Sequence, residues 1–342
     1  MSEILTTKQR LNAYAEIGNI LSTPDPQLTE LINSAKQFNA WFTPESTANA
    51  VKAIAEMLNF ADLEQWIGEN NLSTGGKSVG LILAGNIPLV GFHDILCVLA
   101  TGNKALIKLS SQDKKLIPYI LQKLIEIEPR FKDQVEYIDR LIDFDAVIAT
   151  GSNNTSRYFE YYFSKVPHII RKNRNSIAIL NGNESSEELG KLGHDIFDYF
   201  GLGCRNVSKI YVPRGYDFKN LFEGIESYKP IIDHHKYNNN YDYNKSIFLV
   251  NLDKHLDNGF LLVKEDERLA SPLAVLYYQE YDDVRMLEQE LMEKADQIQC
   301  IVSADQLGIE TVALGESQKP KLWDYADGVD TVAFLRAMGS EK

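Results

Sequence analysis

The middle of the chain alternates short apolar runs with longer amphipathic stretches. The runs Ser78–Ala84, Ala105–Leu109 and Ala146–Ala149 are almost wholly apolar, which is typical of strands buried on both faces. Between them, stretches such as Lys115–Glu128 carry apolar residues at helical spacing. Strands that alternate with helices predict a mostly parallel sheet, so we expect an α/β fold with a Rossmann-like layer.

The pattern differs at the two ends of the chain. Before residue 72, Leu11, Tyr14, Ile17 and Leu21 recur at helical spacing and predict an N-terminal helical segment. After residue 175, further strands are predicted at Ser176–Leu180, Ile210–Val212, Ser246–Asn251, Ala274–Tyr278 and Cys300–Ser303. The polar stretch 238–244 is expected to be a loop.

Composition narrows the class of protein. The 342 residues leave room for about two domains, and the formal net charge of −13 argues against an extended nucleic-acid surface. Cys97, Cys204 and Cys300 are far apart, which fits a reducing cytoplasm better than a disulfide framework or a structural zinc site. We find no leader peptide and no apolar run of about 18 residues, so we expect no membrane span.

One turn places a cysteine where chemistry is plausible. Cys204 lies between a helix-like run, Glu187–Tyr199, and a strand-like run, Ile210–Val212. Its neighbour Gly203 leaves room for a substrate, and the guanidinium of Arg205 favours the thiolate, which is the nucleophile. These residues predict a catalytic cysteine. They leave open a small buried side chain beside a helix cap, the commoner fate of a free cysteine.

Polar groups follow three of the predicted strands. Asn86 offers a side-chain amide that could stabilise a developing oxyanion, or else cap the next helix. Thr150, Gly151 and Ser152 form a turn before a helix, which suits either a pyrophosphate site or an ordinary cap, although the GxGxxG pattern is absent. Lys108 ends a strand, where it could meet a ribose or 2′-phosphate or simply be solvated.

Two other groups of residues do not indicate a functional site. His234 and His235 have no carboxylate or cysteine at ligand spacing, and adjacent side chains of an extended segment point to opposite faces, so we predict no metal site. The aromatic residues of 158–163 fit a packed helix face better than a substrate channel. A GxSxG nucleophile elbow is also missing from the sequence.

The order of these motifs resembles that of a known family. Leu83–Pro88, Ala149–Ser152, Phe200–Lys209 and Leu322–Asp330 are similar to stretches of the long-chain acyl-CoA reductases (LuxC-type) of the aldehyde dehydrogenase superfamily. The resemblance covers about residues 76–340. It implies a Rossmann-like parallel sheet for the nucleotide, a second α/β catalytic domain and an N-terminal helical segment. We expect a helical segment at 1–75, a nucleotide-binding domain at 76–180, a catalytic domain at 181–305 and a tail at 306–342.

The resemblance also implies roles for individual residues. Cys204 matches the acyl-accepting cysteine, and Asn86 matches the oxyanion-hole asparagine. Lys108 matches the lysine at the adenosine ribose, and the turn of Thr150, Gly151 and Ser152 matches the pyrophosphate site. Glu267 is the nearest match to the carboxylate that holds the nicotinamide ribose, with Arg268 as the alternative at that position.

One departure from the superfamily concerns the general base. Oxidising aldehyde dehydrogenases carry a glutamate in a Leu-Glu-Leu-Gly-Gly-Lys motif, whereas the corresponding position here falls near Arg171. Without that base, water is poorly activated against a thioester. We therefore expect an enzyme that reduces an acyl-thioester rather than hydrolysing it.

The predicted function is reduction of an acyl-CoA to a fatty aldehyde through an acyl-cysteine, with NADPH as cofactor and NADH as the alternative. The family is known to take acyl groups from an acyl-protein synthetase, so such a partner is expected, as are a cytoplasmic location and a homodimer. Three other readings stay open: an acyl-carrying subunit of a fatty acid reductase complex, a non-catalytic member of the superfamily, and an aldehyde dehydrogenase that works in the oxidative direction.

Overall fold

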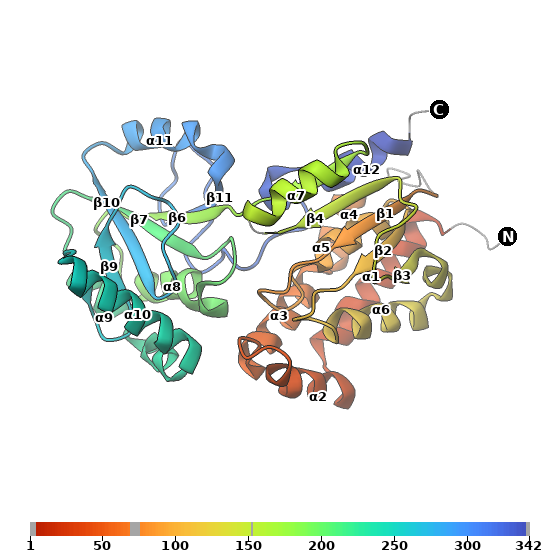
Figure 1. The fold of residues 1–342 in the computed structure, drawn as a ribbon, viewed down its shortest axis with the longest axis horizontal. Helices are drawn as coiled ribbons and strands as arrows, with labels where there is room; N and C mark the ends of the chain where they lie inside the picture. Colours follow the sequence, from red (N-terminus) through yellow and green to blue (C-terminus); the bar gives the residue numbers. More distant parts are fainter. Residues whose placement is uncertain (1–4, 69–75, 152, 340–342) are drawn as a thin grey trace. The chain divides into compact units, whose positions relative to one another are not determined.

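Packing divides the chain into two units, which we describe separately. The computed structural model describes residues 5–68, 76–151 and 153–339. Unit 1 comprises Met1–Asn173 and Pro320–Lys342, and unit 2 comprises Arg174–Lys319 (Figure 1). The four ranges expected from the sequence stay a prediction, to which the structure adds that residues 320–342 belong to unit 1. Within the described ranges, no helix combines the length and the apolar content that crossing a bilayer requires.

Unit 1 begins with the predicted helical segment. Its helices are α1 (Thr7–Ser22), α2 (Pro26–Ser34), α3 (Pro44–Met57) and α4 (Phe60–Ile67). Thr6 and Thr43 cap α1 and α3 through their side-chain oxygens, which accept hydrogen bonds from otherwise unpaired backbone N–H groups. The four apolar residues that predicted α1 are all buried in the core of unit 1, so this prediction is confirmed.

A five-stranded parallel sheet follows, in the order β3-β2-β1-β4-β5. Its strands are β1 (Ser78–Ile82), β2 (Lys104–Lys108), β3 (Val135–Tyr137), β4 (Ala146–Thr150) and β5 (His168–Arg171). Its helices are α5 (Phe92–Ala100), α6 (Leu116–Ile127), α7 (Asn153–Phe163) and α12 (Thr331–Gly339). The strand β1 pairs in parallel with both β2 and β4, so the carboxyl ends of all three meet at one edge. That edge is where open α/β sheets bind ligands.

Unit 2 contains a second sheet, in the order β11-β6-β7-β10-β9-β8. Its strands are β6 (Asn175–Ile179), β7 (Val207–Pro213), β8 (Leu256–Asp257), β9 (Leu262–Glu265), β10 (Val275–Tyr281) and β11 (Ile298–Ser303). Its helices are α8 (Ser186–Phe197), α9 (Phe218–Gly224), α10 (His235–Asn251) and α11 (Val284–Glu293). All pairings are parallel except that of β8 with β9. The core residues place α8 and α9 on one face of the sheet and α11 on the other, as Figure 1 also shows.

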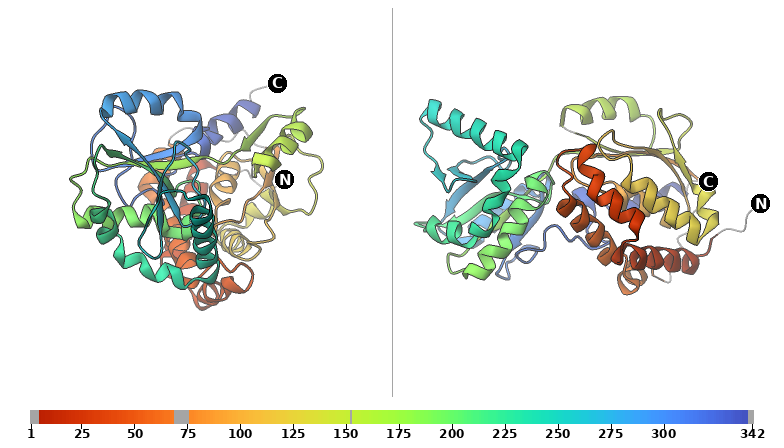
Figure 2. Two further views of the ribbon diagram at one scale, coloured as in Figure 1. Left: turned by 60° about the vertical axis from the view of Figure 1, so that its left-hand side comes forward. Right: turned by 90° about the horizontal axis from the view of Figure 1, so that it is seen from below.

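Two local predictions were wrong. The expected loop at 238–244 and the expected strand at Ser246–Asn251 together form the single helix α10 (Figure 2). The sequence of α10 is mostly polar, but one face of the helix is buried. The residues of that face recur at helical spacing: Tyr237, Tyr241, Asn244 and Phe248. The amide Nδ2 of Asn244 donates to Leu273 O at 3.0 Å, so even the polar member of this face is paired. The strand β5 was missed altogether.

The last residue of β5, Arg171, is buried in a polar cluster. Its Nε and Nη2 donate to the two carboxylate oxygens of Asp94 at 3.1 and 2.5 Å. Its Nη1 donates to Ala326 O at 2.6 Å, and Nη2 also donates to Thr331 Oγ1 at 2.9 Å. Arg171 therefore clamps α5 and the start of α12 to the edge of the unit 1 sheet. A charged strand end of this kind gives no apolar signal, which is why the sequence pattern missed β5.

A buried cation also lies in unit 2, on β7. Lys209 is fully buried, and its ammonium donates to Glu267 O at 2.9 Å and to Gln279 Oε1 at 2.8 Å. Burial away from water disfavours the charged form and lowers the pKa of Lys209 to about 8. Among nearby charges, Lys294 lowers this pKa further, and the carboxylates of Glu290, Asp266 and Glu267 raise it.

We predict that Arg171→Met lowers the free energy of unfolding by about 3–5 kcal/mol, because the carboxylate of Asp94 is left buried without its partner. The matched control is Lys172→Met, which breaks a half-exposed pair with Glu160 and should cost about 1 kcal/mol or less. Urea unfolding of both variants measures the difference. Equal losses in the two variants would contradict the assignment of Arg171 as a clamp.

We also predict a stability signature of Lys209. Between pH 8 and its ordinary pKa of about 10.5, the unfolded chain binds the Lys209 proton while the folded chain has released it. Raising the pH through this window should therefore stabilise the wild type relative to Lys209→Met. Urea midpoints of both proteins at pH 7.5, 8.5 and 9.5 test this, and a difference that is constant with pH would rule it out.

Candidate active site

The turn that carries Cys204 begins with an unusual backbone. Tyr199, Phe200 and Gly201 all have positive φ, at 52°, 60° and 77°. For the two residues with side chains this conformation costs about 1–2 kcal/mol each. Packing offsets the cost, because Tyr199 is buried and the ring of Phe200 packs, tilted, with its centroid 4.3 Å from that of His234. This sharp reversal separates α8 from β7 and leads directly into Cys204.

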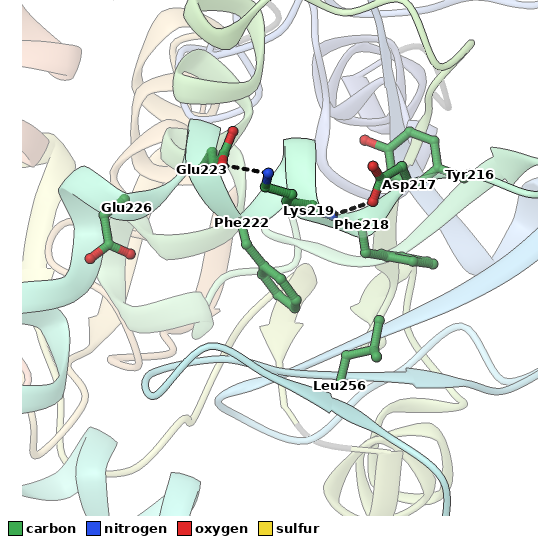
Figure 3. Close-up of a pocket in the computed structure, with 8 residues that line it drawn as sticks. All are labelled: Tyr216, Asp217, Phe218, Lys219, Phe222, Glu223, Glu226 and Leu256. Carbon is green, nitrogen blue, oxygen red and sulfur yellow. Dashed lines mark hydrogen bonds and ion pairs between the residues drawn. The ribbon is translucent and has the colours of Figure 1, made fainter.

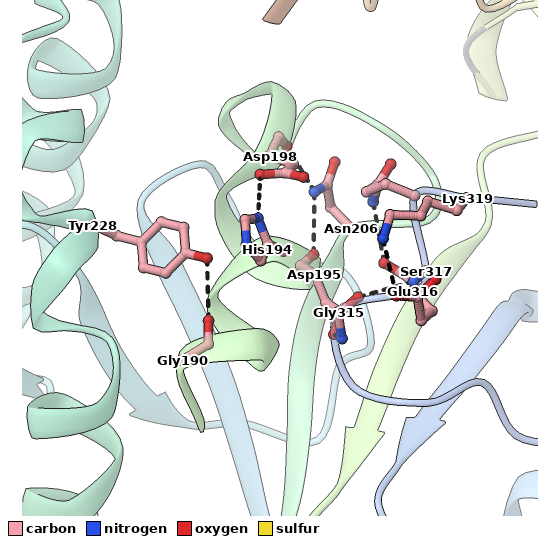
Figure 4. A network of polar contacts seen from close by, with 11 residues as sticks. Gly190, His194, Asp195, Asp198, Asn206, Tyr228, Gly315, Glu316, Ser317 and Lys319 are labelled. Carbon is pink, nitrogen blue, oxygen red and sulfur yellow. Dashed lines mark hydrogen bonds and ion pairs between the residues drawn. The ribbon is translucent and has the colours of Figure 1, made fainter. Parts of the chain in front are cut away.

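Asn206 fixes the far side of the same turn. Its Oδ1 accepts a hydrogen bond from the backbone N–H of Gly203 at 2.8 Å. Its Nδ2 donates to Asp198 O at 2.8 Å and to Asp195 O at 3.1 Å, at the end of α8 (Figure 4). The side chain is almost fully buried, so these bonds are protected from water. Asn206 therefore ties the Cys204 turn to the helix before it.

The carboxylate of Asp195 extends this network to a distant loop. It accepts hydrogen bonds from the backbone N–H groups of Gly315 and Ser317 at 2.6 and 3.0 Å (Figure 4). Asp195 is completely buried, and burial is the main cause that raises its pKa. The end of α8, which Asn206 grips, is thus anchored in the interior of unit 2.

Cys204 itself is exposed, whereas Cys97 is buried and Cys300 is intermediate. Its backbone oxygen accepts a hydrogen bond from Ser176 Oγ at 2.9 Å, which links the turn to β6. An exposed thiol in a firmly held turn does not fit the alternative of a small buried core residue. The geometry instead suits a nucleophile that is open to a substrate.

The segment that follows β9 holds the other predicted residue of unit 2. Glu267 is exposed, and its carboxylate makes no hydrogen bond or ion pair in the described part of the chain. Arg268, the alternative, donates to both carboxylate oxygens of Asp266 at 2.8 and 2.6 Å and to Tyr277 OH at 2.9 Å. The hydrogen bond from Arg268 is the main cause that lowers the pKa of Asp266 to about 2. Because Arg268 is already paired, Glu267 is the better candidate to meet a ligand.

In unit 1, Asn86 lies in the turn that joins β1 to α5. The helix begins at Phe92 and its N-cap position is Gly91, five residues after Asn86. The turn is fixed by two buried side chains: Asn39 donates to Gly85 O at 3.2 Å, and the carboxylate of Asp113 accepts from the N–H of Leu89 at 3.0 Å.

Lys108 and Gly151 flank this turn at the same edge of the sheet. Lys108 is exposed at the end of β2, and Thr150 and Gly151 end β4, with β1 between them. Two strand spacings separate these ends by about 10 Å. A Cβ at Gly151 would lie only 3.0 Å from atoms of Phe159 and Thr155 of α7, so there is little room for a side chain at this position, which is bare backbone. Ser152 lies outside the described residues.

These residues fit a dinucleotide. The exposed Lys108 at the end of β2 can contact a ribose. The backbone at Gly151, which follows β4 and precedes a helix, can bind a pyrophosphate. The structure thus brings Asn86, Lys108, Thr150 and Gly151 to one edge of unit 1, and it holds Cys204 and Glu267 in unit 2.

The sequence analysis missed three residues of unit 2 that support these groups, namely Ser176, Asn206 and Lys209. A lysine inside an otherwise apolar strand was the one available signal, because a buried ammonium needs partners that its neighbours in sequence do not supply.

A hollow of about 670 Å³ lies elsewhere in unit 2, along α9 (Figure 3). Its walls combine Phe218, Phe222 and Leu256 with the charged side chains of Glu223 and Lys219, which pair with each other. Neither Cys204 nor Glu267 lines it. The volume of a hollow alone is therefore a poor guide to the reactive site in this protein.

Several solved structures with a similar fold are aldehyde dehydrogenases. Aldehyde dehydrogenase 21 from Physcomitrella patens, in complex with succinate, is similar with a TM-score of 0.67 at 12% identity over 97% of this chain and 84% of that one. An aldehyde dehydrogenase from Mycobacterium tuberculosis, complexed with NAD+, gives a TM-score of 0.60 at 14% identity over 90% and 77% of the two chains. KauB from Pseudomonas aeruginosa gives 0.61 at 16% identity over 89% and 73%.

These likenesses confirm the expected fold, including its N-terminal helical segment. A search of curated proteins found no match.

The acyl-CoA reductase (LuxC) family matches residues 18–219. The match starts within α1, so the start expected at about residue 76 was too late. It includes Asn86, Lys108 and Cys204 and ends before Glu267 and the tail. The roles of all these residues stay predictions. The match spans more than half of the chain and agrees with the fold. The protein therefore belongs to the acyl-CoA reductase (LuxC) family, oxidoreductases that act on the acyl or aldehyde group.

Proposed function

We propose that the protein reduces a long-chain acyl-CoA to a fatty aldehyde through an acyl group carried on Cys204. The observation that supports this most directly is the exposed thiol of Cys204, held in a rigid turn within the part of the chain that matches the reductase family. Covalent catalysis of this kind divides one difficult reduction into two easier steps.

In the first step the Cys204 thiolate attacks the carbonyl carbon of the acyl-CoA thioester. A carbon–sulfur bond forms, the carbonyl becomes an oxyanion, and its collapse expels the thiolate of CoA and leaves an acyl-cysteine. We assign stabilisation of the oxyanion to the side-chain amide of Asn86 and the backbone N–H of Cys204. Asn86 is suited to this role because it lies in the turn after β1, at the sheet edge where open α/β sheets bind ligands.

In the second step the acyl carbon gains hydrogen, and the same donors stabilise the oxyanion. When bound, the nicotinamide nucleotide supplies the hydride. The oxyanion then collapses, the carbon–sulfur bond breaks, and the aldehyde leaves while Cys204 returns as the thiolate. Acyl-CoA, reduced nucleotide and one proton thus give aldehyde, CoA and oxidised nucleotide.

For the nucleotide we assign Lys108 to the adenosine ribose, the Thr150–Gly151 turn to the pyrophosphate, and Glu267 to the nicotinamide ribose. Ser152 belongs to the same proposed pyrophosphate turn. The exposed ammonium of Lys108 suits either a ribose or a 2′-phosphate, so the preference for NADPH over NADH comes from the family resemblance.

The environment of Arg171 favours reduction over aldehyde oxidation. Its guanidinium is fully engaged by Asp94, Ala326 and Thr331, so the position where oxidising relatives carry a general base is occupied by a structural cation. Water is then poorly activated against the acyl-cysteine, which stays available for reduction. The exposed Lys108 and the bare turn at Gly151 likewise favour a reductase over an acyl carrier, which needs no nucleotide site.

The remaining features of the proposal come from the family resemblance. They are a long acyl chain, an acyl-protein synthetase as donor partner, a homodimer and a cytoplasmic location. Each is separable from the chemistry at Cys204, because none of these features changes the bonds that form and break there.

We predict that Cys204→Ala abolishes acyl-CoA-dependent oxidation of NADPH, because no other described residue takes over the acyl group. Cys300→Ala is the matched control and should keep at least about a third of the wild-type rate. It removes some packing and the contact of Cys300 Sγ with Ser176 Oγ at 3.1 Å, while Ser176 keeps its hydrogen bond to Cys204 O. Absorbance at the nicotinamide band measures both rates. Normal turnover in Cys204→Ala would refute the proposed intermediate.

We predict that Asn86→Ala lowers the rate of Cys204 acylation about 10²- to 10³-fold, the usual effect of losing one oxyanion donor. Binding of NADPH should change little, because Asn86 is assigned to the reacting carbonyl. Rapid-quench acylation and nucleotide titration of the same variant separate the two effects. An unchanged acylation rate would remove Asn86 from the site.

A further inference from the structure

The ammonium of Lys209 lacks an ionic partner in a place where water cannot replace one. The residue is fully buried on β7, five positions after Cys204. In the described part of the chain it forms no ion pair, and its two hydrogen-bond acceptors, Glu267 O and Gln279 Oε1, are both neutral. The face of the Tyr211 ring, 4.7 Å from Nζ, completes its surroundings. A methionine of similar length would avoid the desolvation of the charge, so the ammonium calls for a specific explanation.

Its hydrogen bonds show what the ammonium holds in place. Glu267 lies in the segment between β9 and β10, and Lys209 grips its backbone oxygen at 2.9 Å. The preceding residue, Ser208, donates from Oγ to Leu269 O at 2.8 Å. Two consecutive residues of β7 therefore anchor the Glu267 segment at two points. The strand β7 starts three residues after Cys204. Its first residues therefore connect the Cys204 turn to the Glu267 segment.

Glu267 gains its position from this anchoring. Its own carboxylate is exposed and has no hydrogen bond or ion pair among the described residues. The hydrogen bond from Lys209 to Glu267 O therefore fixes the backbone of the residue that carries the carboxylate. A carboxylate that must meet a ribose needs such a fixed starting point.

We infer that Lys209 is a positioning residue for the nucleotide: its buried ammonium fixes the backbone of Glu267 beside the strand that begins at the Cys204 turn. This inference rests on the proposed function, because it gives the Glu267 carboxylate a ribose to hold. Lys209 touches neither substrate nor cofactor in this account and acts only through Glu267.

Lys264 provides a matched comparison. It lies on β9 in the same cross-strand row as Lys209, since both pair in register with Tyr277. Its ammonium, however, binds the carboxylate of Asp253 at 2.9 Å, and it makes no hydrogen bond to the backbone of Glu267 among the described residues. The variant Lys264→Met therefore removes a lysine from the same cross-strand row but keeps the hydrogen bond between Lys209 and Glu267 O.

The experiment measures NADPH affinity by titration calorimetry, and Cys204 acylation by mass spectrometry with palmitoyl-CoA in the absence of nucleotide. Lys209→Met and Glu267→Gln should each weaken NADPH binding about tenfold or more, the effect of losing one charge-assisted hydrogen bond. The double variant should bind no more weakly than the weaker single variant, because both changes remove the same interaction. Lys209→Arg should recover most of the affinity, and Lys264→Met should match the wild type.

Acylation without nucleotide should stay within a few-fold of wild type in Lys209→Met, which a general loss of structure would not permit. Wild-type NADPH affinity in Lys209→Met, or multiplied losses in the double variant, would overturn the inference while leaving the proposed function intact. If the wild type takes no acyl group and binds no nucleotide, the proposed function fails and the inference with it. Should Lys209→Met not fold, Gln279→Leu removes one of the two acceptors and should weaken NADPH binding in the same direction. An unchanged affinity in that variant would then count against the inference.

Discussion

The side chain of Asn206 is the constraint on which the proposed chemistry depends. The chain reverses through three consecutive left-handed residues, Tyr199 to Gly201, and such a turn does not keep its shape by backbone preference. Asn206 bridges it, accepting from Gly203 on one side and donating to the end of α8 on the other. These hydrogen bonds hold the strained turn in one conformation, in which Cys204 is exposed. Strain of this kind is common at reactive sites because the surrounding structure can hold it there.

Hydrogen bonds from β6 and β7 connect the Cys204 turn to other parts of unit 2. Ser176 holds the oxygen of Cys204, while Ser208 and Lys209 hold the Glu267 segment. In unit 1 the same principle operates with different residues, since parallel pairing delivers Asn86, Lys108 and Gly151 to one edge of the sheet. Each unit therefore positions its functional groups with regular elements and a few buried polar side chains, rather than with loops alone.

The sequence predicted the features that depend on local pattern. Apolar runs located most strands of both sheets, and the predicted site residues Asn86, Gly151 and Cys204 all lie in turns next to those strands. It could not predict features that arise from contacts distant in sequence. The helix α10 looked like a loop because its Asn-rich surface outweighs four buried positions, and β5 escaped because the partners of Arg171 lie 77 and 160 residues away. The roles of Asn206 and Lys209 could not be predicted for the same reason, because their hydrogen-bond partners are brought close only by the fold.

The measurement that tests the account most directly is the intact mass of the protein after incubation with palmitoyl-CoA, followed by addition of NADPH. The account predicts one added palmitoyl group, mapped by peptide analysis to Cys204 and released as palmitaldehyde when NADPH is added. An acyl group on another residue, or one on Cys204 that neither NADPH nor NADH discharges as aldehyde, would contradict it.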